Sequence, residues 1–227
     1  MIKKLLVIIF FLHTFSIAAE GKDKEIVQLP EPQYDKGLTV GEALNIRRSV
    51  RSFSSKKLVL REVSELLWAS SGKTFDGTTA ASRTYPSAGG LHPLNVYLVT
   101  GGVEDIKDGI YKYESKDHTI TLLKEGDYRK SLAQAGLGQS FIRIAPVCII
   151  ITALYNRTGM VYGERGTVRY IHMDAGHAAQ NVCLMSASLG LGTVAVGAFI
   201  DEKVKNILGL EKEVPLYLLP VGHPSGK

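Results

Sequence analysis

The chain is organised around the stretch YPSAGGLHPLNVYLV, residues 85–99, in which a loop of small residues between two prolines runs directly into an apolar segment. Each proline fixes its own φ and moves the residue before it toward extended conformations. The glycines at 89 and 90 permit positive φ and a close approach of the backbone to a neighbour. Residues 95–99 are β-prone, so we expect a buried strand that supports a rigid loop suited to a flat or anionic ligand. A plain glycine–proline turn without a ligand stays open as the alternative.

The sequence predicts three regions along the chain. Of its 227 residues, 45% are apolar, which is enough for one large domain. Residues 1–19 have the layout of a secretory signal peptide, since two lysines precede an apolar run that ends in small residues. Residues 20–38 read as an extended leader, and residues 39–227 as the folded domain. We therefore expect an exported, periplasmic protein. The alternative is an uncleaved membrane anchor, although the run is short of the ~20 residues of a spanning helix.

The charge of the chain is mild and its cysteines are few. The formal net charge is +5, but lysine and arginine are scattered and lack interleaved aromatic residues, so no nucleic-acid partner is predicted. Cys148 and Cys183 lie in apolar segments and are typical of small core residues, with a disulfide between them as the open alternative. His172 and His177 lack the i,i+4 spacing of a helical zinc site, so no metal is predicted.

A cluster of guanidinium groups follows the first predicted helix of the domain. Thr39 and Glu42 form a capping box at its start, and an apolar stripe continues to residue 46. The next residues include Arg47, Arg48, Ser49 and Arg51. Forked donors beside a hydroxyl match a phosphate group. The alternative is that these arginines cap helix carbonyls and face water.

The remaining pattern alternates strands and helices. Helices are expected at 58–69, 131–141, 168–189 and, with Asp201 as N-cap, 201–208, and strands at 146–153 and 214–221, with a hairpin formed by 109–113 and 119–123. Within the helix at 131–141, Gln139 is a candidate reader of a heterocycle edge, or else faces solvent. The small residues from 190 to 199 suit either contact with a planar ligand or a tight crossing in the core.

Taken together, these segments resemble the nitroreductase-like flavoprotein family, and within it the SagB-type branch of azoline dehydrogenases and their stand-alone relatives. The resemblance covers residues from about 40 to the C-terminus. It rests on six motifs in family order, namely RRSVR (47–51), PSAGGLHP (86–93), YGERG (162–166) with Arg169 and Tyr170, DAGHAAQN (174–181), GLGTVAVGAF (190–199) and LPVG (219–222).

The resemblance implies an α+β fold of three layers, with a mixed, mostly antiparallel central sheet between helices. It also implies a homodimer with two FMN sites at the subunit interface. Carried over by position, Arg47, Ser49 and Arg51, with Arg48 beside them, resemble the contacts to the FMN phosphate and ribityl chain. The loop that reaches the flavin from the other subunit corresponds to Pro86, Ser87, Ala88, Gly89 and Gly90, and the backbone along the isoalloxazine to Ala195, Val196, Gly197 and Ala198. Lys227 corresponds to a late basic contact to the phosphate.

The resemblance further implies an FMN-dependent oxidoreductase with a ping-pong cycle. Such an enzyme moves hydride or electrons through flavin N5 to or from a small organic substrate, with NAD(P)H as an expected electron donor. Azoline dehydrogenases carry a Lys-Tyr pair for acid/base chemistry, and the corresponding residues here are Val161 and Tyr162. Valine cannot transfer a proton, so Tyr162 is the one catalytic candidate, with a structural role as its alternative. Two other functions stay open, namely a flavin-binding protein without turnover and an azoline-peptide dehydrogenase that lacks the lysine.

Overall fold

The computed structural model describes residues 25–33, 36–74 and 82–226, and it has an α+β fold around one sheet. Seven strands lie in the order β1-β4-β3-β2-β5-β7-β6, and every strand pair in the described ranges is antiparallel. The strands are β1 (Ile26–Gln28), β2 (Leu94–Thr100), β3 (Gly109–Glu114), β4 (Thr119–Glu125), β5 (Val147–Ala153), β6 (Gly192–Thr193) and β7 (Val214–Gly222). Parallel pairing is confined to isolated bridges such as Ser49 with Thr193.

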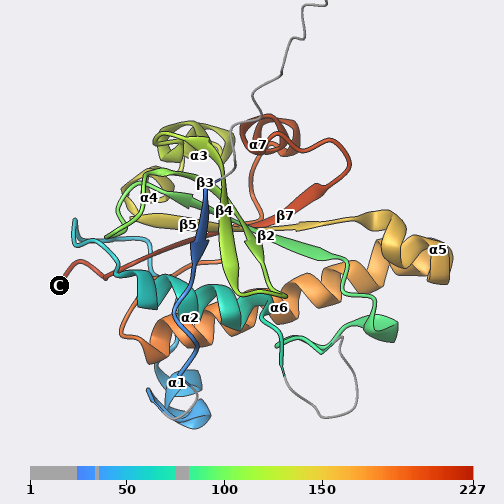
Figure 1. The fold of residues 1–227 in the computed structure, drawn as a ribbon, viewed down its shortest axis with the longest axis horizontal. Coiled ribbons are helices and arrows are strands. Elements are labelled where there is room, and N and C mark those ends of the chain that lie inside the picture. The colour runs from blue at the N-terminus through green and yellow to red at the C-terminus, as the bar shows by residue number, and fades with distance from the viewer. Residues whose placement is uncertain (1–24, 34–35, 75–81, 227) are drawn as a thin grey trace, which may run out of the picture.

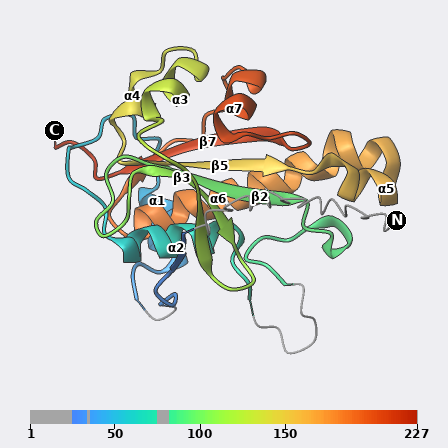
Figure 2. The ribbon, with the colours of Figure 1, turned by 45° about the horizontal axis from the view of Figure 1, so that its top comes forward.

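Helices cover both faces of the sheet, so the predicted three-layer arrangement is confirmed (Figures 1 and 2). One face carries α1 (Val40–Ile46), α2 (Leu60–Ser71) and α6 (Ile171–Ser188), and the other carries α3 (Arg129–Ala135), α4 (Ser140–Ile144) and α7 (Asp201–Leu208). At one end of the sheet, α5 (Tyr155–Arg165) and the π-helical turn η2 (Gly166–Tyr170) lead into α6. The short 3₁₀ turn η1 (Ala88–Gly90) lies in the loop before β2.

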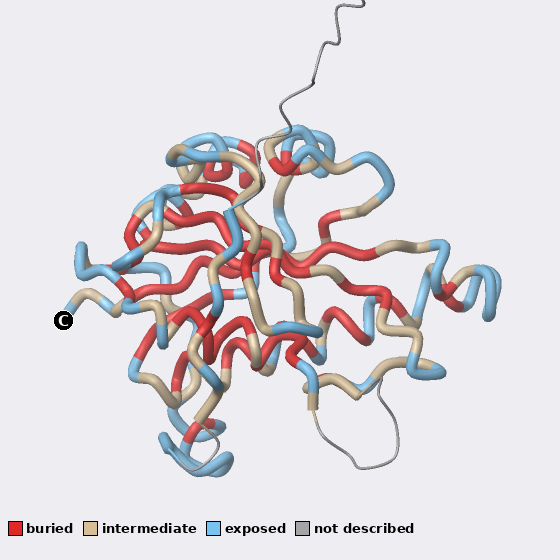
Figure 3. Tube along the Cα trace, viewed as in Figure 1, coloured by how far each residue is buried: buried red, intermediate tan, exposed pale blue. Residues whose placement is uncertain are grey.

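The core lies on both faces of the strands, which are the most continuously buried part of the chain (Figure 3). All seven residues of β5 are buried. Its alternate residues separate into two clusters: Val147, Ile149 and Ile151 pack toward α2 and α6, whereas Cys148 and Ile150 pack toward α3 and α7. An apolar side chain is therefore needed at every position, which explains the continuous apolar run in the sequence.

The predicted leader is extended where it is described, but it belongs to the fold. Residues 26–28 form β1, which pairs with β4 at the edge of the sheet, and Leu29 is buried in the core. The side chains of Ser64 and His118 both contact the carbonyl oxygen of Pro30, at 2.5 and 3.1 Å. A domain boundary at residue 38 was therefore wrong, because backbone pairing of so short a segment was not visible in its composition. The signal peptide predicted at residues 1–19 lies outside the described residues.

The helix predicted over 131–141 is interrupted. It divides into α3 and α4 because Leu137 and Gly138 have φ of +58° and +78°, which a right-handed helix does not allow. At the start of α7, Ile200 is the N-cap, and the predicted cap Asp201 is the first helical residue. The other predicted helices and strands are present with bounds shifted by a few residues.

Two further observations concern the cysteines and membrane crossing. Cys148 and Cys183 are both free and buried, so the core assignment holds and the disulfide alternative does not. None of the helices in the described ranges has both the length and the hydropathy that crossing a bilayer requires.

Candidate functional site

The arginine segment follows α1 and lies along β6. The capping box of Thr39 and Glu42 is present at the start of α1, and the helix ends with Arg47 as its C-cap. Beyond it, Ser49 pairs with Thr193, and the amide of Val50 donates to the carbonyl oxygen of Thr193 at 2.9 Å. This close approach depends on Gly192, since a Cβ there would lie 2.6 Å from the Val50 side chain. The predicted residues 47–51 are therefore held in place by the small-residue strand.

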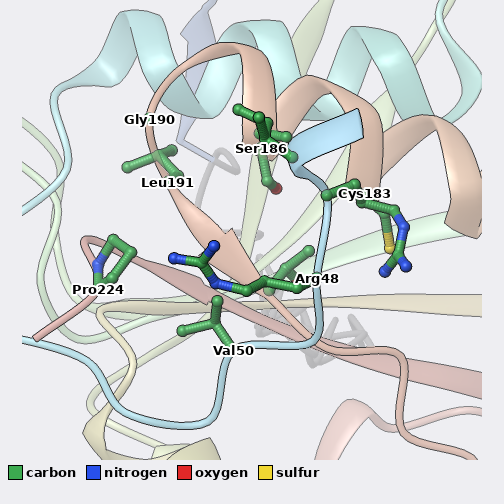
Figure 4. A pocket seen from close by; sticks show the side chains of 11 residues that line it. Arg48, Val50, Cys183, Ser186, Gly190, Leu191 and Pro224 are labelled. Carbon is green, nitrogen blue, oxygen red and sulfur yellow. The ribbon is translucent and has the colours of Figure 1, made fainter. Parts of the chain in front are cut away.

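A cavity of about 170 Å³ lies beside this segment, between the C-terminal half of α6 and β6 (Figure 4). Its lining comprises Ile46, Arg47, Arg48, Val50, Cys183, Ser186, Ala187, Gly190, Leu191, Thr193 and Pro224. In Figure 4 the side chain of Arg48 extends across the cavity toward Leu191 and Pro224. The end of the chain also approaches here, because Ser225 Oγ lies 2.5 Å from Ser52 Oγ. Lys227 itself lies outside the described residues.

Several polar groups in and beside the cavity have no partner among the described residues. The guanidinium groups of Arg47 and Arg48, which line the cavity, and of Arg51, in the same segment, make no hydrogen bond or ion pair within the described ranges. The hydroxyls of Ser186 and Thr193, in residues that are 1% and 3% exposed, also lack a partner among the described residues. Buried hydroxyls are normally hydrogen-bonded, so unpartnered ones beside free guanidiniums fit an anion that bears several oxygens. A phosphate monoester has that chemistry.

The thiol of Cys183 faces the same cavity. Burial raises its pKa, and the nearby charge of Arg47 opposes that rise. Because burial dominates, the thiol stays protonated at neutral pH, so we assign it no nucleophilic role.

Residues 195–198 follow Thr193 of the cavity lining and are mostly exposed. Ala195, Gly197 and Ala198 are exposed, whereas Val196 is buried and exchanges two backbone hydrogen bonds with Leu218, at 2.9 and 3.0 Å. The side-chain amide of Gln139 donates to the carbonyl oxygens of Ala198 and Gly136, at 3.0 and 2.8 Å. Both N–H donors of Gln139 are thus used to hold backbone, so its direct contribution to a ligand is limited to its carbonyl oxygen.

The predicted loop at 86–90 forms a second cluster with Tyr162. Gly89 and Gly90 have φ of +60° and +65° and are exposed. The hydroxyl of Tyr162 packs against the loop, since a Cβ at Gly89 would lie 2.6 Å from it. The ring of Tyr162 also meets Tyr170 edge-on, with ring centroids 5.2 Å apart. The catalytic candidate and the loop therefore share one surface.

Asp174 anchors this loop and was not recognised from the sequence. It is 3% exposed on α6, and Ser87 Oγ donates to its carboxylate at 2.5 Å. Burial raises the pKa of Asp174, and hydrogen bonds from Ser87 and the Ala88 backbone oppose the rise. One signal was available: Asp174 occupies a position where the apolar stripe of Ile171, Ala175 and Ala178 predicts burial. A charged residue at such a position needs a partner.

The two clusters lie at opposite ends of α6 in a single chain. Asp174 marks the loop end and Cys183 the cavity end, nine residues apart, which is about 14 Å along a helix. In Figure 1, α1 and the end of α6 lie far from α5, near which the loop lies. The structure thus joins residues 49–50 to Thr193, Gln139 to Ala198 farther along the same segment, and separately the loop at 86–90 to Tyr162.

Comparison with known proteins identifies related chains. The family model described as the nitroreductase family matches residues 44–223. The chain is 46% identical over 196 residues to a protein of Methanocaldococcus jannaschii named as a nitroreductase, covering 86% of this chain and 95% of that one. The fold is also similar to the solved structure of a nitroreductase from Ralstonia eutropha. The two superpose with a TM-score of 0.77 at 28% sequence identity, and the alignment covers 91% of this chain and 93% of that chain.

Two relatives of lower identity carry other names. The chain is 26% identical over 195 residues to the trifolitoxin operon protein TfxC of Rhizobium leguminosarum bv. trifolii, covering 80% of this chain and 54% of that protein. It is 26% identical over 139 residues to the FMN reductase (NAD(P)H) of Bacillus subtilis, covering 55% of this chain and 56% of that protein.

Proposed function

Since the chain belongs to the nitroreductase family and is therefore an oxidoreductase, we propose that it uses FMN, bound between two copies of the chain, to oxidise or reduce a small organic substrate. The observation that carries this proposal is the set of free donors around one cavity. Two guanidinium groups, of Arg47 and Arg48, and two buried hydroxyls line it without a partner among the described residues, and the free guanidinium of Arg51 belongs to the same segment. The FMN reductase of Bacillus subtilis, similar to about half of this chain, supports FMN as the flavin.

Each predicted residue has a role in this proposal. Arg47, Arg48 and Arg51 hold the phosphate, and Ser49 contacts the ribityl chain, since these donors suit a phosphate and its polyol. Residues 195–198, with mostly small and exposed side chains, would lie along the isoalloxazine. When bound there, FMN supplies hydride transfer at N5, and the protein contributes binding, orientation and exclusion of water. Few acid or base side chains are required for such a reaction.

The site needs a second copy of the chain. A cavity of about 170 Å³ is small compared with the roughly 300–1,000 Å³ of typical ligand pockets, so one chain encloses only part of the cofactor. The loop at 86–90 contacts Asp174 and Tyr162 at the far end of α6 from the cavity, so in this proposal it serves the site of the other copy. Large apolar side chains are exposed on the helices next to both clusters, and these suit a subunit interface: Val40, Leu44, Met160, Val161, Val168 and Met173.

The proposed reaction follows a ping-pong course. In such a course NAD(P)H and the substrate would bind in turn at the same place over the flavin. The hydroxyl of Tyr162, which packs on the loop, donates or orients a proton at the substrate. This residue is exposed to 38%, so a substrate can reach it.

A second candidate is the dehydrogenation of azoline rings in peptides. It follows from the resemblance of the sequence motifs to the azoline dehydrogenases, and the chain is also similar to the trifolitoxin operon protein TfxC. It requires Tyr162 to act without the lysine of the usual pair, since Val161 stands in its place. For that reason we place it second.

The proposal also covers location. Residues 1–19 act as a signal peptide that directs the protein to the periplasm, or, uncleaved, as an anchor in the membrane. Fractionation of cells that produce the full chain, with N-terminal sequencing of the product, tests this: cleavage after Ala18 or Ala19 supports export, and an intact Met1 supports the anchor.

The experiment that tests the function is an absorption titration of the purified protein. Mature protein with added FMN should show a bound-flavin spectrum, elute as a dimer, and be bleached by NADPH or NADH and recoloured by a quinone or nitroaromatic compound. A flavin that no donor bleaches would favour binding without turnover. A colourless monomer that takes up no FMN would overturn the proposal. Oxidation of a thiazoline peptide, with Tyr162→Phe inactive, would favour the second candidate.

A further inference from the structure

The loop at 87–92 is shaped almost entirely by its own hydrogen bonds and by one side chain of α6. The amide of His92 donates to Ser87 Oγ, and the amide of Gly90 donates to the carbonyl oxygen of Ser87, each at 3.0 Å. The amide of Leu91 donates to Ala88, and that of Ala88 to the carboxylate of Asp174. Among the amides from 88 to 92, only that of Gly89 has no acceptor in the part of the chain that the structure describes. Gly89 is exposed, so this one free donor belongs to a residue that a ligand can reach.

The carboxylate of Asp174 holds this arrangement. Ser87 Oγ donates to it at 2.5 Å and is at the same time the acceptor for the His92 amide, so the carboxylate fixes both ends of the turn through one hydroxyl. A buried carboxylate is costly in free energy unless it is hydrogen-bonded, and hydrogen bonds to a charged acceptor are about twice as strong as neutral ones. Two turns further along α6, the side-chain amide of Asn181 donates to the carbonyl oxygen of Thr84 at 2.9 Å. The chain that enters the loop is therefore also tied to α6.

We propose that Asp174 is the positioning residue of the flavin site: through Ser87 and the Ala88 amide it holds the 87–92 loop in the shape that points the free Gly89 amide at the flavin bound by the other copy of the chain. This inference rests on the proposed function, because it assumes that the loop reaches that flavin. The new part is that α6 fixes the conformation of the loop, while the other end of the same helix lines the phosphate cavity through Cys183 and Ser186. One rigid helix thus positions parts of both flavin sites in a dimer.

The first arm of the test needs no flavin. Hydrogen exchange of the amides at 88, 90, 91 and 92 is compared in wild type, Asp174→Asn, Ser87→Ala and the double variant. Asparagine keeps the volume and removes the charge, so the chain stays folded. We expect exchange at these amides to be about tenfold faster in each single variant, as for loss of about 1.4 kcal/mol. The double variant should exceed them only slightly, because both changes remove the same contact.

The matched control is Glu213→Gln. The carboxylate of Glu213 accepts hydrogen bonds from Tyr97 Oη, at 3.0 Å, and from Thr152 Oγ1, and none of these residues belongs to the loop. It should change the melting temperature without changing exchange at 88–92. Equal exchange in wild type and Asp174→Asn would overturn the anchoring role.

The second arm measures the flavin itself. FMN is titrated by fluorescence into each full-length variant, and the reduction potential of the bound FMN is measured. We expect Asp174→Asn and Ser87→Ala to weaken FMN binding by about tenfold and to shift the potential, because the Gly89 amide moves. Glu213→Gln should leave both unchanged. Wild-type affinity and potential in Asp174→Asn would overturn the inference while the proposed function stands. Failure of wild type itself to bind FMN would overturn the proposed function first.

Discussion

Gly192 decides how closely the arginine segment approaches β6, and Gly192→Ala therefore tests the architecture of the site. A Cβ at residue 192 would lie 2.6 Å from Cγ1 and 2.7 Å from Cβ of Val50. Carbon atoms normally pack about 3.5–4.0 Å apart, so the segment has to retreat by about 1 Å. The retreat strains the hydrogen bond from the Val50 amide to Thr193, now 2.9 Å long, and the pairing of Ser49 with Thr193.

Two effects follow from this displacement. Overpacking of this kind lowers the free energy of unfolding by about 1–3 kcal/mol. In a chain of this length each kcal/mol corresponds to about 2–4 °C, so the melting temperature should fall by about 2–12 °C. The guanidinium groups of Arg47 and Arg48 move with the segment, and a hydrogen bond lengthened by about 1 Å is effectively lost. FMN affinity should then fall about tenfold.

The assay combines scanning calorimetry with fluorescence titration of FMN, and Gly41→Ala is its control. Gly41 lies within α1, with nothing within 4 Å of the added Cβ. Alanine there should stabilise the protein by about 0.5–1 kcal/mol and leave FMN affinity unchanged. If Gly192→Ala melts and binds FMN as wild type does, the close packing of the arginine segment on β6 does not hold the site, and the reasoning fails.

Three more outcomes are expected. Arg47→Ala should weaken FMN binding by ~1.5–3 kcal/mol, the value of a hydrogen bond to a charged group; unchanged binding in a fluorescence titration would mean that the phosphate is held elsewhere. Gly89→Ala should lower the free energy of unfolding, measured in urea, by ~1–2 kcal/mol because alanine is strained at a φ of +60°. A larger loss would come from the clash of the alanine Cβ with the Tyr162 hydroxyl, and adding Tyr162→Phe to the same chain should recover that part. Burial lowers the pKa of His118 below its usual 6.5, so the unfolded chain binds a proton at this residue more readily than the folded chain does. The stability of the folded chain that depends on a neutral His118 is therefore complete above pH 6.5 and is lost as the pH falls through the folded pKa. Urea unfolding of His118→Asn should therefore show a weaker loss of stability in acid than wild type, and parallel profiles would contradict the assignment.

The sequence alone determined the elements whose cause is local. The run at 147–153 is apolar at every position, which predicted a buried strand, and the structure buries all seven residues of β5. The capping box of Thr39 and Glu42 fixed the start of α1, because its hydrogen bonds join residues three apart. The clustering of Arg47, Arg48 and Arg51 could be read as a site for the same reason. All three lie within one short segment.

Only the tertiary structure decided which segments meet. Ser87 and Asp174 are 87 positions apart, and the periodicity of α6 does not predict which residue donates a hydrogen bond to its buried carboxylate. The pairing of residues 26–28 with β4 also depends on a neighbour that is remote in sequence. The predicted site residues fall at the two ends of α6, which their order in the chain does not reveal. Periodicity reports which face of an element is buried, whereas the contacts of that face follow from the packing of the whole chain.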